Sequence, residues 1–168
     1  STSNIFNEKH NNSNNDGEEL NFLYRLRDFE GNGLDTNCHH GKTTFELQSK
    51  YPEIKVYGID ASKNNIKIAQ KKYMHNNFIP IDFECYTGIP HASFSVVQVQ
   101  NYKNLMLNFL KALHILEDNG LLILHCNDID DLSKIRRYLD ANKTLYLKKM
   151  LNMTLSYHVI DKTIYLFK

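Results

Sequence analysis

Several features that would fix a function class are scarce or missing in this 168-residue chain. The cysteines Cys38, Cys85 and Cys126 are few, widely spaced and odd in number, which indicates free thiols in a reducing, intracellular compartment rather than a disulfide framework. No apolar run reaches the ~18 residues of a membrane span, so no span is expected. The net charge of +1 argues against a strongly electrostatic polyanion binder. Tryptophan is absent, and the ten tyrosines and nine phenylalanines indicate core packing without pointing to a function.

The N-terminal segment also lacks hydrophobic residues. Only Ile5 and Phe6 are apolar among the first sixteen residues, and asparagine is abundant. The segment has neither the apolar stretch of a signal peptide nor the arginines of a transit peptide. We therefore expect residues 1–19 to be a disordered tail and residues 20–168 to form a single domain.

The rest of the chain alternates between helical and strand patterns. Strands are expected at Gly33–Thr36, Ile54–Ile59, Phe78–Cys85, Phe94–Val99 and Leu121–Leu124. Helices are expected at Glu18–Phe29 and Lys42–Tyr51, after Ser62, from Leu105 to Leu116, and after a cap at Asp128 or Asp130.

Two features place strands within the expected sheet. Pro80 cannot donate to a strand ladder, so its strand should lie at an edge. Two β-rich runs, Leu145–His158 and Thr163–Phe167, flank the turn residues Asp161 and Lys162 and predict an antiparallel pair. The whole pattern predicts a doubly wound, Rossmann-like α/β sandwich, mostly parallel and ending in an antiparallel strand pair.

The stretch from Gly33 to Asp60 carries the strongest functional signal. It runs strand, tight loop, helix, strand, and Asp60 lies nineteen positions after Gly41. That separation is close to the ~20 residues between a ligand-cradling turn and the ribose-binding carboxylate of nucleotide-binding βαβ units. Asp60 is also suited to a helix cap or turn, and the ribose-binding interpretation is favoured.

Four segments, taken in order, resemble the class I S-adenosylmethionine-dependent methyltransferases of the type 11 branch, over about Leu20 to Lys168. Family members have LD-x-G-x-G-x-G, then G-x-D-x-S, then LP followed by SFD-V-V, then a leucine-rich helix, a turn and an apolar strand. The corresponding segments here are Leu34-Asp35-Thr36-Asn37-Cys38-His39-His40-Gly41, Gly58-Ile59-Asp60-Ala61-Ser62, Ile89-Pro90 with Ser93-Phe94-Ser95-Val96-Val97, and Leu113–Leu116 with Asn119-Gly120 and Leu121–Leu124.

The resemblance implies S-adenosylmethionine as cofactor. Asp60 would bind the ribose, Gly41 and neighbouring amides the cofactor carboxylate, and Glu84 or Cys85 the adenine edge. The cofactor-binding residues implied in this way are Asp35, Asn37, His39, Gly41, Asp60, Ala61, Glu84 and Cys85. The catalytic residues and the methyl acceptor stay unknown.

The chain departs from the family pattern at several positions. Asn37 and His39 replace two loop glycines, Cys85 aligns with the acid expected after the third strand, and Ser95 replaces the SFD acid. A histidine in left-handed geometry costs ~1–2 kcal/mol, and its ring would point into the cofactor space unless the loop shifted. The chain is therefore either a methyltransferase or an inactive methyltransferase-fold scaffold of a protein or RNA assembly. Because several of these motif residues are replaced together, we expect that the chain descends from a methyltransferase but now serves as an inactive scaffold.

Other site classes fit the sequence less well. Adjacent Cys38, His39 and His40 do not have zinc-ligand spacing, so no metal is expected. Gly41-Lys42-Thr43 is no P-loop, because Thr36 stands where the first glycine is required. Gly31-Asn32-Gly33 begins a dinucleotide fingerprint that Thr36 also interrupts, which leaves an NAD enzyme as a weak alternative.

Overall fold

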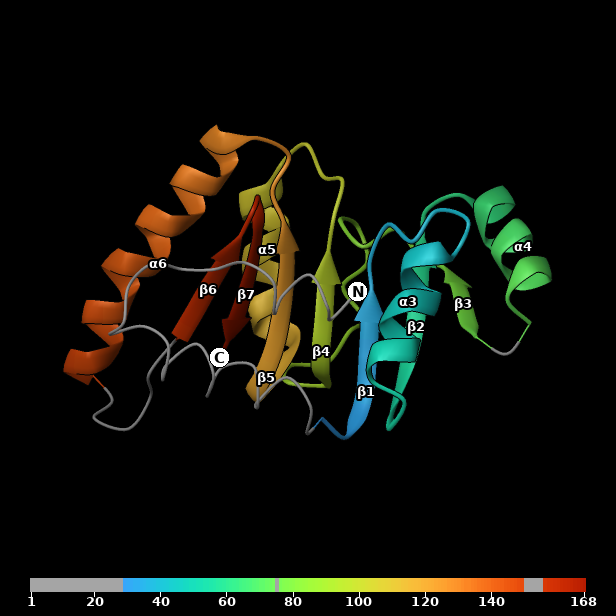
Figure 1. The fold of residues 1–168 in the computed structure, drawn as a ribbon, viewed down its shortest axis with the longest axis horizontal. Helices are drawn as coiled ribbons and strands as arrows, with labels where there is room; N and C mark the ends of the chain where they lie inside the picture. The colour runs from blue at the N-terminus through green and yellow to red at the C-terminus, as the bar shows by residue number, and fades with distance from the viewer. Residues whose placement is uncertain (1–28, 75, 150–155) are drawn as a thin grey trace.

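A computed structural model describes residues 29–74, 76–149 and 156–168 (Figure 1). The strands are β1 Gly31–Asp35, β2 Ile54–Asp60, β3 Asn77–Pro80, β4 Phe94–Val99, β5 Leu116–His125, β6 Ser156–Ile160 and β7 Thr163–Phe167. The helices are α3 Lys42–Lys50, α4 Lys63–Lys72, α5 Leu105–Ile115 and α6 Ile129–Lys149. None of the helices in this described part is both long enough and apolar enough to cross a membrane.

The strands form one seven-stranded sheet in the order β3-β2-β1-β4-β5-β7-β6. The five strands from β3 to β5 are parallel, and β7 pairs antiparallel with both β5 and β6. The chain moves outward from β1 to β3 and then returns to β4 on the other side of β1. This confirms the predicted doubly wound fold, and it puts the topological switch point, where such sheets bind ligands, between β1 and β4.

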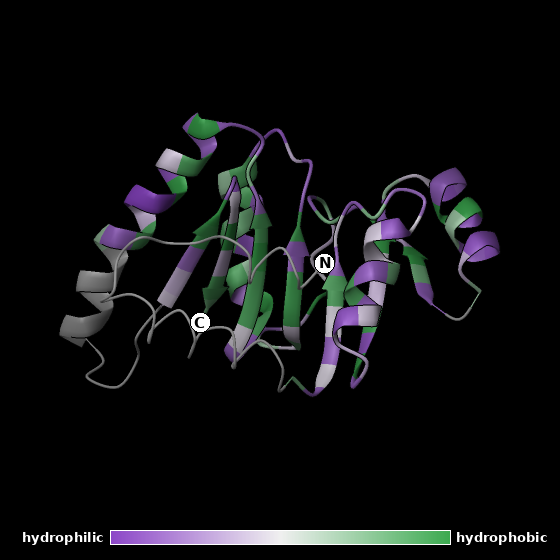
Figure 2. Ribbon diagram, in the orientation of Figure 1, coloured by the Kyte–Doolittle hydropathy of each residue, from purple (hydrophilic) through white to green (hydrophobic). Residues whose placement is uncertain are grey.

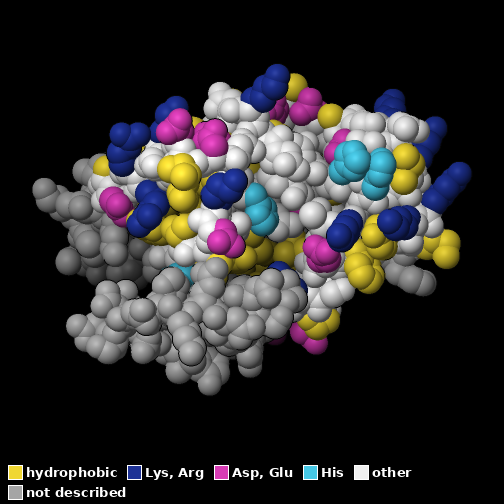
Figure 3. Space-filling view, turned by 45° about the horizontal axis from the view of Figure 1, so that its top comes forward, with side chains coloured by type: hydrophobic (Ala, Val, Ile, Leu, Met, Phe, Trp, Pro, Cys, Tyr) yellow, Lys and Arg dark blue, Asp and Glu magenta, His cyan; other side chains and the backbone are white. Residues whose placement is uncertain are grey.

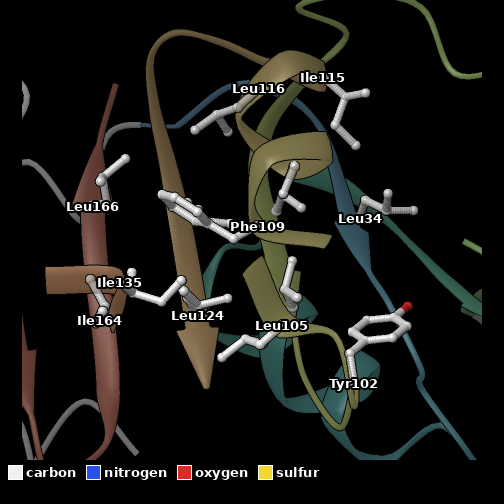
Figure 4. Close-up of a cluster of buried hydrophobic side chains, with 14 of the residues drawn as sticks. Leu34, Tyr102, Leu105, Phe109, Ile115, Leu116, Leu124, Ile135, Ile164 and Leu166 are labelled. Atoms are coloured by element: carbon white, nitrogen blue, oxygen red, sulfur yellow. The ribbon is translucent and has the colours of Figure 1, made fainter. Parts of the chain in front are cut away.

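The face of the sheet under α5 and α6 holds the larger core cluster. Figure 4 shows Phe109 of α5 and Ile135 of α6 among strand residues such as Leu124 and Ile164. Phe109 and Leu124 are fully buried. Burying such side chains stabilises the fold by roughly 1.5–3 kcal/mol each. The central strands are accordingly the most hydrophobic part of the chain, whereas α4 is largely hydrophilic (Figure 2).

The opposite face packs against α3. Leu47 of this helix lies in a second cluster with Val56, Val96 and Ile123. Phe29 closes the cluster, because its ring meets Tyr51 edge-on at 5.7 Å and stacks on Phe167 at 6.1 Å. The residues on either side of the sheet alternate along each strand, as expected for a sheet buried on both faces.

The third strand differs from its prediction. It was predicted over Phe78–Cys85 but ends at Pro80, which pairs with Asp60 at the outer edge of the sheet. The edge position is thus confirmed. The strand ends early because Asp82 organises a turn: its carbonyl oxygen accepts from the N–H groups of Cys85 and Tyr86.

The C-terminal pair also differs in part. The predicted strand from Leu145 is wrong at its start, because residues 145–149 continue helix α6. Extending an existing helix is easier than starting a new element, and this outweighs the local strand preference. The antiparallel β6–β7 hairpin and its turn at Asp161 are confirmed. Of the two predicted caps of α6, Asp128 accepts a hydrogen bond from the Asp131 N–H at 2.8 Å.

Other boundaries shift by less. Strand β1 begins at Gly31 rather than Gly33, and β5 begins at Leu116, with Asn119 in left-handed geometry inside it. The predicted tail 1–19 and residues 18–28 of the predicted first helix lie outside the described residues. Phe29, the last residue of that predicted helix, is not helical.

Candidate cofactor-binding site

The carboxyl edge of the sheet, where β1, β2 and β4 end, gathers most of the predicted site residues. The loop 36–41 joins β1 to α3 there, Asp60 ends β2, and the turn 82–86 follows β3. Figure 3 tilts this edge toward the viewer and shows histidine and lysine side chains around its right-hand part. The edge coincides with the switch point of the sheet.

Asp35 lies beneath the loop and is fully buried. Its Oδ2 accepts from the hydroxyls of Thr43 and Thr44, each at 2.7 Å, and its Oδ1 accepts from the side-chain amides of Gln98 and Gln100 at 2.9 and 3.0 Å. Burial raises the pKa of Asp35 from 3.8 to about 6, against the lowering effect of these hydrogen bonds. With four protein donors and no exposed surface, Asp35 anchors α3 to β4 and is withdrawn from direct ligand contact.

The polar network continues from Asp35 across the sheet. Gln98 Oε1 lies 2.8 Å from His125 Nε2, and His125 Nδ1 lies 3.1 Å from Thr163 Oγ1. Gln98 Oε1 can only accept, so His125 Nε2 carries the proton. Burial lowers the pKa of His125, which favours the neutral ring and leaves Nδ1 to accept from Thr163.

Gln98, Gln100 and His125 were not among the residues predicted for the site. The available signal was alternation: Gln98 lies in the buried strand β4 and Gln100 directly follows it, two positions apart, so both face the side of the sheet that Asp35 faces. Asp35, the partner that Gln98 and Gln100 share, is more than sixty positions away in sequence, and only the fold brings it to them.

The loop has left-handed backbone at the three positions for which the resemblance led us to expect glycine. The φ angles are 48° at Asn37, 52° at His39 and 95° at Gly41. Asn37 is held by its side-chain amide, which donates to the carbonyls of Gln100 and Asn101 at 3.1 and 3.2 Å. His39 is exposed, and its ring lies 3.9 Å from the ring of His40.

Gly41 is required by packing. An added Cβ would lie 2.7 Å from the Phe78 ring and 3.0 Å from the Ala69 side chain. The Gly41 N–H donates to the Cys38 carbonyl at 2.9 Å, so this N–H closes the loop internally. The Gly41 N–H is therefore not free to donate to a ligand carboxylate.

Asp60 joins the loop to the start of α4. Its Oδ2 accepts from the His39 N–H at 2.9 Å, and its Oδ1 accepts from the Ser62 N–H at 2.9 Å and the Asn65 side chain at 3.4 Å. Asp60 is 9% exposed, and the adjacent Ala61 is exposed. Ser62 caps α4 as predicted, because its hydroxyl accepts from the Asn65 N–H.

The turn after β3 contains three polar candidates. Glu84 is exposed but accepts a hydrogen bond from the Asn108 side chain at 2.9 Å, and Cys85 is an exposed thiol. The first acid after the strand is Asp82, two residues past Pro80; it was not among the predicted site residues, because the strand was predicted to run to Cys85. The early strand end at Pro80 was the signal that could have found it.

The described residues contain no group of three or more histidine, cysteine or acidic side chains that could share a metal ion. Cys38 is buried, and burial raises the pKa of its thiol to about 12. Cys38 is therefore a core residue beneath the loop and no nucleophile.

Comparison with known proteins agrees with this geometry. Residues 34–120 match the family model described as a methyltransferase domain. No curated protein sequence matches the chain.

Solved structures share the fold at low sequence identity. The plantazolicin methyltransferase BpumL, crystallised with a triazolic desmethylPZN analogue and S-adenosylhomocysteine, has a TM-score of 0.63 and 13% identity, over 99% of this chain and 83% of that one. The YcgJ protein of Bacillus subtilis has a TM-score of 0.58 and 18% identity, over 84% and 69%. The mmp1179 protein of Methanococcus maripaludis has a TM-score of 0.57 and 12% identity, over 88% and 80%. At these identities the likeness shows the fold alone.

The match of the family model is more specific, because it covers residues 34–120, slightly more than half of the chain, and includes the loop, Asp60 and the turn after β3. The chain therefore belongs to the methyltransferase domain family, in which S-adenosylmethionine is the methyl donor.

Proposed function

We propose that this chain binds S-adenosylmethionine at the carboxyl edge of β1, β2 and β4 and transfers its methyl group to an acceptor of unknown class. The observation that carries the proposal is the backbone of the loop. Asn37 and His39 both have left-handed φ angles, which a glycine at these positions would readily adopt, so neither side chain forces the backbone out of that geometry. The His39 ring is exposed and rests on His40, rather than being buried within the loop.

The residues at this edge suit the parts of the cofactor. Asp60 accepts three hydrogen bonds from the chain, which leaves one lone pair, on Oδ2, and we assign Asp60 to the ribose hydroxyls. Asp82 is exposed and is assigned to the adenine amino group, because Glu84 is engaged by Asn108. Asn37, His39 and Ala61 contribute backbone near the cofactor, whereas the buried Asp35 supports the loop from below.

When bound, S-adenosylmethionine supplies a methyl group on a sulfonium centre that an aligned nucleophile can attack. The chain's contribution is then to orient the two reactants, and orientation alone can supply about 7–11 kcal/mol of a barrier. In the segment after β4, Gln100 is occupied by Asp35 and Tyr102 is buried, while Asn101 is exposed. Of residues 100–102, the first three after β4, Asn101 is thus the one open to an acceptor.

A second function, a scaffold that no longer binds the cofactor, is favoured by one observation. Both oxygens of Asp60 already accept hydrogen bonds from the chain itself, and little of the side chain is exposed. A ribose would have to share Asp60 with these internal donors. Under this alternative the chain would serve as a subunit of a protein or RNA assembly.

Calorimetric titration of the full chain with S-adenosylhomocysteine separates the two functions. The proposal predicts micromolar binding, about 8 kcal/mol, that Asp60→Ala weakens at least tenfold. Asp60 also contacts the start of α4, so circular dichroism of the variant must show a folded chain. Asp130→Ala, an exposed acid on α6, is the matched control and should bind like the wild type. A folded wild type that gives no heat at millimolar ligand would support the scaffold instead.

A further inference from the structure

The turn formed by residues 82–86, called here the Asp82 turn, is fastened to helix α5. The Nζ of Lys111 donates to the carbonyls of Phe83 and Tyr86, at the two sides of the turn. The side-chain amide of Asn108, one helical turn earlier, donates to Glu84 Oε1 at 2.9 Å. Because Lys111 and Asn108 are three positions apart on one helix, they face the turn together.

The turn is also anchored from inside. Phe83 is 2% exposed and its ring centroid lies 6.0 Å from that of Tyr102. The Lys111 ammonium lies 4.7 Å from the centroid of the Phe83 ring, within cation–π range. One lysine therefore contacts both the backbone and the buried side chain of the turn.

The orientation of the Asn108 side chain is set by the hydrogen bonds that its Nδ2 donates. Its Nδ2 bonds to Glu84 and to the Asn104 carbonyl, while its Oδ1 is buried with no hydrogen-bond partner. A buried acceptor without a partner is unfavourable, so the orientation of the amide follows from the two bonds that it donates.

The charges at this contact are complementary. Asp82 and Glu84 both act on Lys111 and favour its charged form, in opposition to burial, which lowers the pKa of Lys111. Two carboxylates in one short turn repel each other, and the ammonium offsets this repulsion. Asp82 itself accepts from the Glu84 N–H at 3.1 Å through Oδ1. This bond fixes the direction of the carboxylate relative to the turn.

We propose that Lys111 and Asn108 are positioning residues that hold the Asp82 turn so that the Asp82 carboxylate selects a 6-aminopurine over a 6-oxopurine. The inference rests on the proposed cofactor binding and adds the source of base specificity. A carboxylate accepts from the amino group of adenine, but it meets the lone pairs of the 6-oxo group of hypoxanthine. Selection therefore depends on the carboxylate staying in place, which is what α5 secures.

The test compares the affinities of S-adenosylhomocysteine and S-inosylhomocysteine for the full chain by calorimetry. The wild type should prefer the adenine compound by about tenfold or more. Lys111→Met should lose most of this preference through weaker binding of the adenine compound, with little change for the inosine compound. Lys111→Arg, which can still donate to two carbonyls, should restore the ratio. Asn108→Leu should lower the ratio of the affinity for S-adenosylhomocysteine to that for S-inosylhomocysteine, and Lys134→Met on α6 should leave this ratio unchanged.

The possible results distinguish the role of Lys111 and Asn108 in base selection from cofactor binding itself. A merely structural role for Lys111 would weaken both ligands equally and leave their ratio unchanged, which would overturn the inference while cofactor binding stands. A folded wild type that binds neither compound would overturn both. Loss of the ratio in Lys111→Met with recovery in Lys111→Arg supports the inference.

Discussion

At the scale of single residues, Asp35 is the most consequential side chain beneath the site. Its pKa of about 6 in the folded chain lies above its ordinary value of 3.8, so the folded state holds this proton more tightly than the unfolded state does. Its contribution to stability is present below pH 4 and is lost as the pH rises through about 6. The shift corresponds to about 3 kcal/mol.

Asp35→Asn should therefore remove this pH dependence. The amide cannot ionise, and the hydroxyls of Thr43 and Thr44 can turn to accept from its Nδ2. We expect the unfolding free energy, measured by urea denaturation between pH 4 and 7.5, to fall less steeply with pH than in the wild type. Equal slopes for Asp35→Asn and wild type would show that Asp35 titrates normally.

At the scale of elements, the start of α3 is locked against α4 and β3 through Gly41. Gly41 and Gly31 share the same φ of 95°, but an added Cβ meets Phe78 and Ala69 at Gly41 and nothing within 4 Å at Gly31. Comparing an alanine substitution at each glycine therefore distinguishes the cost of backbone strain from the cost of steric overlap.

Gly31→Ala should lower the unfolding free energy by about 1–2 kcal/mol, the cost of left-handed geometry. Gly41→Ala should lose that amount and a further ~1–3 kcal/mol from overpacking. Chemical denaturation of both variants at neutral pH measures the difference. Equal losses would mean that α4 or β3 moves aside freely, and that the loop is less firmly packed than the contacts indicate.

The elements also show which parts of the fold local sequence can predict. Strand β4 and the helix after Ser62 follow from β-branched runs, helical spacing and a capping hydroxyl, which are local properties. The end of β3 at Pro80 and the extension of α6 to Lys149 do not. The first depends on a turn closed by Asp82, and the second on a helix that continues through strand-forming residues.

Some residues of the candidate site could likewise be predicted from local sequence, and others could not. Asp60 could be placed at the end of β2 because its spacing from Gly41 is a property of one βαβ unit. The burial of Asp35 and the chain through Gln98 to His125 could not be predicted, because these residues come from strands that only the sheet order brings together. Asp82 was missed because its position depends on where β3 ends.

At the scale of the whole molecule, the central claim is that the cofactor occupies the carboxyl edge at the switch point between β1 and β4. Hydrogen exchange of the full chain, with and without saturating S-adenosylhomocysteine, tests this claim most directly. The account predicts slower exchange in the loop 36–41, at the end of β2 around Asp60, and in the Asp82 turn, with little change in the β6–β7 hairpin. No change at saturating ligand, or protection confined to other parts of the chain, would contradict it.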